Sequence, residues 1–184
     1  VLGNVAHDNA EVEDLSVSML RYPSAMATVT ASVVHHGERQ ALTAQCEKAC
    51  IAVPHQVYAS QSLPTGFPRE DPELEEQLNR LYAAQPALPY EGHTAQIDNV
   101  LTCLEQGGTT PAITGEDGRR TIELITAIYK AGATRQPVQL PLTPEDPFYT
   151  VAGIQAHAPH FYEKSASLAD LGENAVLPGN YFTR

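Results

Sequence analysis

Polar side chains with hydrogen-bonding chemistry fall where strands and helices are expected to begin or end. The candidates are His35, His36, His55, Tyr58, His93 and Gln96. An imidazole can donate a hydrogen bond to a hydroxyl group or accept one from it, so these side chains could contact a polar ligand. Each group also has a plainer interpretation. The first two histidines fit a solvated turn, the next pair an exposed strand end, and the last pair a helix anchor.

Motifs that would support chemistry by this chain alone are absent from the sequence. Its glycines never form G-x-G-x-x-G after a strand, and neither G-x-S-x-G nor H-E-x-x-H occurs. Cys46 and Cys50 could ligate a metal in principle, but no second Cys/His pair has ligand spacing. Their position in a strand-like run favours small buried side chains instead.

A charge cluster at Glu116, Asp117 and Arg119 has two interpretations. The three side chains could form a reactive group, or they could cap a helix and pair locally. The second interpretation is favoured because an apolar helical stripe begins just beyond Gly118, and Asp117 can accept hydrogen bonds from the free amides of a first turn.

Composition excludes some partners. The chain has 184 residues and a net charge of −11, from 11 basic and 22 acidic side chains. Phosphate binding needs clustered lysine and arginine, so nucleic acid and anionic membrane are not expected partners. No apolar run approaches the roughly 20 residues of a membrane span. Three cysteines without disulfide spacing fit a reducing, cytoplasmic location.

The first half of the chain alternates as β-strands do. Residues 13–21 and 27–33 predict a hairpin around Pro23-Ser24, with one apolar and one small-polar face. Residues 42–53 predict a strand region broken by a turn near 47–49, and residues 55–61 extend or follow it. The predicted fold class is α+β, a mostly antiparallel open β-sheet covered by helices on one face.

Three segments show helical periodicity. Pro72 opens the first, at 73–84; the second follows Tyr90 and stops at Gly107-Gly108. The third has a broad apolar face after Asp117, and Gly132 is placed as its C-terminal cap. A short strand is expected before Pro141, and no sustained periodicity marks the residues beyond it.

Several short motifs in residues 90–141 occur together in a fixed order. A helix is followed by G-G-x-x-P-x-I-T-G-E-D-G-R-R, then by a helix ending in A-I-Y-K-A-G, then by P-V-x-L-P. Earlier pieces agree: V-E-D-L opens a strand, Y-P-S-A forms a turn and E-K-A-C precedes another strand. From Val12 to Pro141 the chain thus resembles the C-terminal domain of the Gfo/Idh/MocA family, the sugar and polyol oxidoreductases related to glucose–fructose oxidoreductase and inositol dehydrogenase. No motif here is a catalytic signature, so the combination carries the resemblance.

The resemblance implies an NAD(P)-dependent dehydrogenase acting on a sugar, polyol or related hydroxy compound. In that family a Rossmann domain carries the nucleotide fingerprint and an E-K-P lysine, and a D-x-x-x-H motif supplies the catalytic histidine. None of these occurs here, and the adjacent His7 and Asp8 lack the spacing. We therefore expect the catalytic pair and the site for NAD or NADP upstream of Val1. The chain alone is expected to be inactive and to bind no cofactor.

The resemblance also implies a division of the chain. Residues 1–11 would connect from a missing dinucleotide-binding domain, residues 12–142 would form the α+β substrate and oligomerisation domain, and residues 143–184 an extended tail packing on it. The open sheet face would line the site of a sugar-like substrate and pair with another subunit as a homo-oligomer, unless it simply faces water. A rival interpretation is a non-catalytic binding or scaffold protein that retains this domain without a Rossmann partner.

Overall fold

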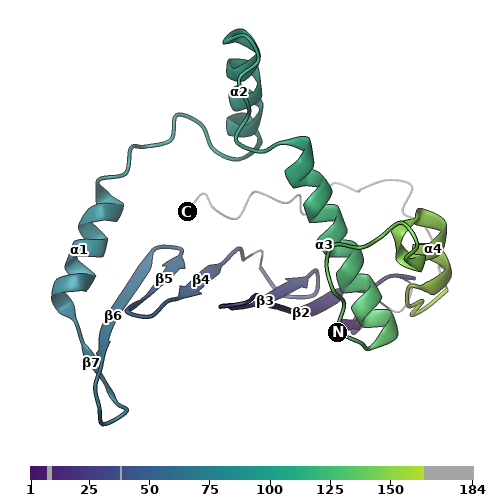
Figure 1. The fold of residues 1–184 in the computed structure, drawn as a ribbon, viewed down its shortest axis with the longest axis horizontal. Coiled ribbons are helices and arrows are strands. Elements are labelled where there is room, and N and C mark those ends of the chain that lie inside the picture. Colours follow the sequence, from purple (N-terminus) through teal and green to yellow (C-terminus); the bar gives the residue numbers. More distant parts are fainter. Residues whose placement is uncertain (8–9, 38, 164–184) are drawn as a thin grey trace. The chain divides into compact units, whose positions relative to one another are not determined.

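A computed structural model describes residues 1–7, 10–37 and 39–163. The described chain divides into two compact units, one formed by residues 1–37 with those from 108 onward, the other by residues 38–107. We name them unit 1 and unit 2, and Figure 1 shows their helices and strands. Antiparallel strands and helices build both, so the predicted α+β class is confirmed. The strands form two sheets, however, where one was expected.

Unit 1 has a three-stranded antiparallel sheet in the order β1-β2-β3. Its strands are β1 (Leu2–Gly3), β2 (Leu15–Arg21) and β3 (Met26–Ser32). The predicted hairpin β2–β3 is therefore confirmed. The strand β1 was not predicted; residues 1–11 were expected only to connect, yet Leu2 pairs with Ser16.

The predicted faces of this hairpin are wrong, because the turn sets a different register. Arg21 pairs with Met26 across a four-residue turn, which aligns odd-numbered residues of β2 with even-numbered residues of β3. Val17 therefore lies opposite Thr30, and Ser18 lies opposite Val29. Directly paired residues share a face, so both faces mix apolar and small-polar side chains.

The helix α3 (Gly115–Thr134) is the longest element of unit 1. Its N-cap is Thr114, three residues before the predicted cap, and its C-cap is Arg135, which adopts the left-handed conformation. Gly132, predicted to cap its C-terminus, lies inside it, where an added Cβ would be 2.7 Å from Leu2 Cγ. Because Leu2 shares the face of Ser16, α3 lies on that face of the sheet.

The chain returns along α3 after the helix ends. The strand predicted before Pro141 does not form, because side chains of α3 hold this segment in place of a sheet. Glu123 Oε1 accepts from the Leu142 amide at 2.7 Å, and Lys130 forms an ion pair with Asp146. A 3₁₀ turn, η1 (Pro147–Tyr149), buries Phe148 and leads into the helix α4 (Val151–His157), which packs against α3. Residues 164–184, included in the expected tail, lie outside the described residues.

Unit 2 has a four-stranded antiparallel meander in the order β4-β5-β6-β7. The strands are β4 (Leu42–Gln45), β5 (Ala49–Val53), β6 (Gln56–Ser62) and β7 (Pro68–Glu70). The break predicted near residues 47–49 is the turn from β4 to β5. Val57 and Ala59 of β6 are buried.

Two helices follow in unit 2. The first, α1 (Pro72–Ala83), packs on β6; Asp71 caps it by accepting from the Leu74 amide at 3.1 Å. The second, α2 (Gly92–Glu105), carries the predicted apolar stripe and ends before Gly107. No described helix is long and apolar enough to cross a membrane.

Candidate functional site

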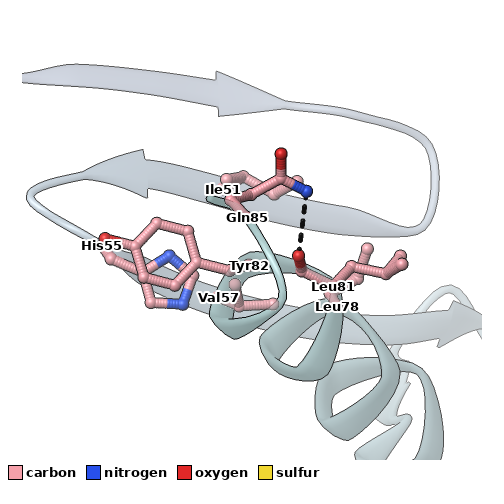
Figure 2. Close-up of a pocket in the computed structure, with 7 residues that line it drawn as sticks. All are labelled: Ile51, His55, Val57, Leu78, Leu81, Tyr82 and Gln85. Atoms are coloured by element: carbon pink, nitrogen blue, oxygen red, sulfur yellow. Dashed lines mark hydrogen bonds between the residues drawn. The ribbon is translucent and has the colours of Figure 1, made fainter. Parts of the chain in front are cut away.

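A shallow apolar groove of about 220 Å³ lies in unit 2 where α1 meets the β5–β6 hairpin (Figure 2). Its lining residues are Ile51, His55, Val57, Leu78, Leu81, Tyr82 and Gln85. Ile51 and Val57 pair across the strands and so share the face that α1 covers. Leu78 and Leu81 belong to the apolar stripe of α1. The groove therefore lies where the apolar side of α1 packs on the apolar face of the β5–β6 hairpin.

His55 gives this groove its polar chemistry. It lies in the tight turn between β5 and β6, and its ring stacks on Tyr82 with centroids 3.6 Å apart and planes 4° from parallel. His55 Nε2 lies 2.9 Å from Asn79 Oδ1. The amide of Asn79 is oriented by its own donation to the Glu75 carbonyl at 2.9 Å, which presents Oδ1 to the histidine.

This geometry fixes the tautomer of His55. Because Asn79 Oδ1 can only accept, Nε2 of the histidine must carry a proton. In the neutral ring Nδ1 is then a hydrogen-bond acceptor. An acceptor nitrogen held beside apolar walls can orient a ligand hydroxyl, and the walls suit the C–H faces of such a ligand.

The other predicted site residues of unit 2 do not line the groove that holds His55. Tyr58 follows Val57 on β6, so it points from the opposite face of the strand, and it is 63% exposed. His35 and His36 lie in an exposed bend after β3, in unit 1. His93 and Gln96 are exposed on α2 and hydrogen-bond each other at 3.0 Å, which fits their anchoring role.

Asn79, Tyr82 and Gln85 were missed as neighbours of His55. A spacing of three residues places Asn79 and Tyr82 on one side of α1, adjacent to its leucine stripe, and Gln85 follows just after the helix ends. That spacing could have identified them as a group. The turn that brings His55 to this helix depends on how the hairpin packs, which the sequence pattern does not specify.

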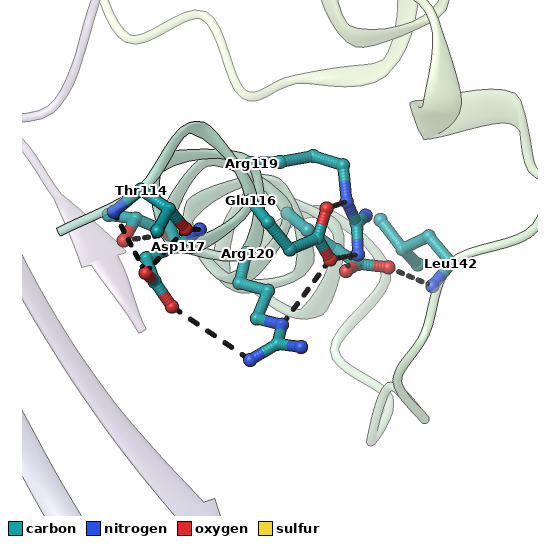
Figure 3. Close-up of polar contacts among 8 residues, drawn as sticks. Thr114, Glu116, Asp117, Arg119, Arg120 and Leu142 are labelled. Carbon is teal, nitrogen blue, oxygen red and sulfur yellow. Dashed lines mark hydrogen bonds and ion pairs between the residues drawn. The ribbon is translucent and has the colours of Figure 1, made fainter. Parts of the chain in front are cut away.

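Asp117 of the charge cluster forms a capping box with Thr114 at the start of α3, and the other two residues of the cluster pair locally (Figure 3). Asp117 accepts from the Thr114 amide at 3.0 Å, and the Thr114 hydroxyl accepts from the Asp117 amide at 3.3 Å. Arg119 binds Glu116 at 2.9 Å and Glu123 at 3.2 Å. The Arg119 guanidinium lowers the pKa of Glu116, and the Glu116 carboxylate raises that of Arg119. The structural interpretation of this cluster accounts for its contacts.

Among residues 1–7, 10–37 and 39–163, no group of three or more His, Cys, Asp or Glu side chains is placed to hold a metal ion. Cys46 is exposed and Cys50 is half-buried, so the prediction that both are small buried side chains is wrong for Cys46; Cys103 of α2 is buried.

Residues 4–140 match the sequence profile of the family described as "Oxidoreductase family, C-terminal alpha/beta domain", which is the Gfo/Idh/MocA C-terminal domain. The match covers most of the chain and includes all of unit 2 together with β2, β3 and α3 of unit 1. No curated protein and no solved structure matches the chain.

Proposed function

Because the chain belongs to the Gfo/Idh/MocA oxidoreductase family through its C-terminal domain, we propose that it is the substrate-binding and oligomerisation domain of an NAD(P)-dependent dehydrogenase. The family match over residues 4–140 is the observation that carries this proposal. The substrate class we propose is a sugar, polyol or related hydroxy compound. The nicotinamide, held by an upstream domain, would supply the hydride acceptor or donor.

In this proposal, the groove of unit 2 contributes contacts to the substrate. His55 Nδ1 would accept a hydrogen bond from a substrate hydroxyl while Asn79 holds the ring in place. Leu78 and Leu81 would contact the apolar faces of the substrate. These groups touch parts of the substrate that do not react, so they should bind the ground state and the transition state alike.

The test is steady-state kinetics of the intact dehydrogenase with His55→Ala. Removing one orienting hydrogen bond should raise KM by about two- to tenfold and leave kcat nearly unchanged. The matched control is His157→Ala, which removes an exposed imidazole of α4 that is not among the candidate site residues and should change neither constant. An unchanged KM in His55→Ala would contradict the proposal that the groove contacts the substrate.

A second test concerns the cofactor. The chain of 184 residues contains no nucleotide fingerprint, so adding it should not change the fluorescence of NADH or NADPH at micromolar cofactor. Saturable binding would contradict the assignment of the cofactor to an upstream domain. An intact protein that transfers no hydride would favour the binding or scaffold alternative.

A further inference from the structure

Glu11 holds the segment that follows α4 through two of its atoms. Its backbone carbonyl accepts from the Phe161 amide at 3.1 Å, and its Oε1 lies 2.7 Å from Nδ1 of His160. The other ring nitrogen of His160, Nε2, lies 3.2 Å from the Gln155 carbonyl of α4. The imidazole therefore connects the N-terminal segment to the end of α4, and all of these groups belong to unit 1.

The two contacts of this imidazole require a particular protonation state. A carboxylate oxygen and a backbone carbonyl are both acceptors, and they face opposite nitrogens of one ring. A neutral imidazole carries one N–H and can satisfy only one of them, whereas the imidazolium ion satisfies both. The arrangement thus favours the charged ring. The Gln155 carbonyl and the Glu11 carboxylate accordingly raise the pKa of His160.

The nearby titratable groups are engaged elsewhere. His157 of α4 directs Nδ1 to the Gly153 carbonyl at 2.8 Å. Glu13 accepts from the Tyr129 hydroxyl of α3, and Asp14 binds residues 5–7. Glu11 is thus the carboxylate that faces the imidazole in the described part of unit 1.

We propose that His160 and Glu11 form a proton-dependent clasp, which fastens the N-terminal segment to the end of α4 and opens as the pH rises. A histidine whose pKa is raised by folding stabilises the closed form fully below its unfolded value. That contribution is lost as the pH rises through the higher folded value. The clasp is independent of the proposed function. One consequence of the clasp does rest on the proposed function: the N-terminal segment that it holds would be the segment that connects to the upstream domain.

Nuclear magnetic resonance of the full chain tests the clasp by following the ring nitrogens of His160 and the exchange protection of the Phe161 amide against pH. In the wild type, loss of the ring proton should coincide with a two- to fivefold drop in the protection of the Phe161 amide. The expected drop is small because about half of each side chain is exposed, and exposed ion pairs stabilise weakly. In Glu11→Gln the imidazole should titrate at lower pH. In His160→Gln the protection should no longer vary in this pH range.

His157→Gln is the matched control, because it removes the neighbouring imidazole of α4 and should leave the pH profile of Phe161 unchanged. Far-ultraviolet circular dichroism of each variant checks that α3 and α4 remain folded. A Phe161 protection that does not change when His160 titrates would overturn the proposal. So would an equal loss of pH dependence in His157→Gln.

Discussion

Asp14 fixes the first residues of the chain onto unit 1. Only 3% of it is exposed, and its carboxylate accepts from the amides of Val5, Ala6 and His7 at 2.9 to 3.2 Å. Burial alone would raise the pKa of Asp14. The hydrogen bonds from Val5, Ala6 and His7 outweigh burial and lower the pKa to about 2. The N-terminal segment is therefore held by a charged acceptor, although the sequence predicted only an unstructured connection there.

A pH titration should reveal this role. Because the folded pKa is depressed, the stabilisation by Asp14 is present above about pH 4 and is lost as the pH falls toward 2. We expect exchange protection of the Val5 and Ala6 amides to fall over that range. In Asp14→Asn the protection should already be lost at neutral pH. Asp98→Asn, which changes an exposed carboxylate of α2, should leave both amides unaffected.

The candidate site could be predicted only in part at the scale of single residues. His55 was predicted as a candidate from its type and its place after a strand, and it lies in the groove beside Tyr82. Tyr58 was grouped with it, but a separation of three residues along strand and turn leaves the two on different surfaces. Side-chain direction depends on the exact strand boundary, which residue type does not reveal.

At the scale of elements, the α3 cap is the clearest energetic feature. Thr114 and Asp117 bond each other's backbone amides reciprocally. Replacing Thr114 by Ala should lower the free energy of unfolding by about 0.5–2 kcal/mol, because an amide of the first turn loses its acceptor. Thr121→Ala is the control, since this exposed threonine lies within α3 and should cost little. Chemical denaturation measures both, and equal effects would contradict the capping role.

Gly153 of α4 and Gly118 of α3 have different surroundings, so replacing each by alanine should have opposite effects on stability. A Cβ added at Gly153 would lie 1.7 Å from the Pro147 carbonyl oxygen, so the close approach of η1 requires glycine. Gly153→Ala should destabilise unit 1 by about 1–3 kcal/mol and separate α4 from η1. At Gly118 of α3 an added Cβ meets no atom within 4 Å. Gly118→Ala should therefore stabilise the helix by about 0.5–1 kcal/mol. Thermal unfolding of the two variants should shift in opposite directions.

The elements themselves were largely predictable, and their contacts were not. Alternation located β2 to β6, and Pro72 marked the start of α1. The face assignment of the β2–β3 hairpin failed because one residue of turn length inverts it. The helix α4 was missed because seven residues give too little periodicity to read, and its position depends on the partner surface of α3.

At the scale of the whole molecule, one surface of unit 1 supports the proposed oligomer. The sheet face away from α3 carries Val17, Met19, Met26, Thr28 and Thr30, and we name it the Met19 face. Met19 and Met26 are 68% and 66% exposed. Exposed apolar side chains that share one face of a sheet are typical of subunit interfaces.

We predict that the chain self-associates through the Met19 face. Met19→Lys places a charge at its centre and should shift the mass measured by light scattering to that of the monomer. Val53→Lys alters an exposed valine of unit 2 and should leave the association unchanged. A wild-type chain that remains monomeric at high concentration would count against the oligomerisation role.

The most direct test of the central claim is the sequence encoded upstream of Val1 in the native gene, read together with the activity of the intact product. A Rossmann domain adds roughly 100–150 residues, with G-x-G-x-x-G between a strand and a helix. We predict that this domain is present, with a D-x-x-x-H segment between it and residue 1, and that the product reduces NAD or NADP with a sugar or polyol. A native product without these motifs, inactive toward such substrates, would contradict the assignment to a dehydrogenase.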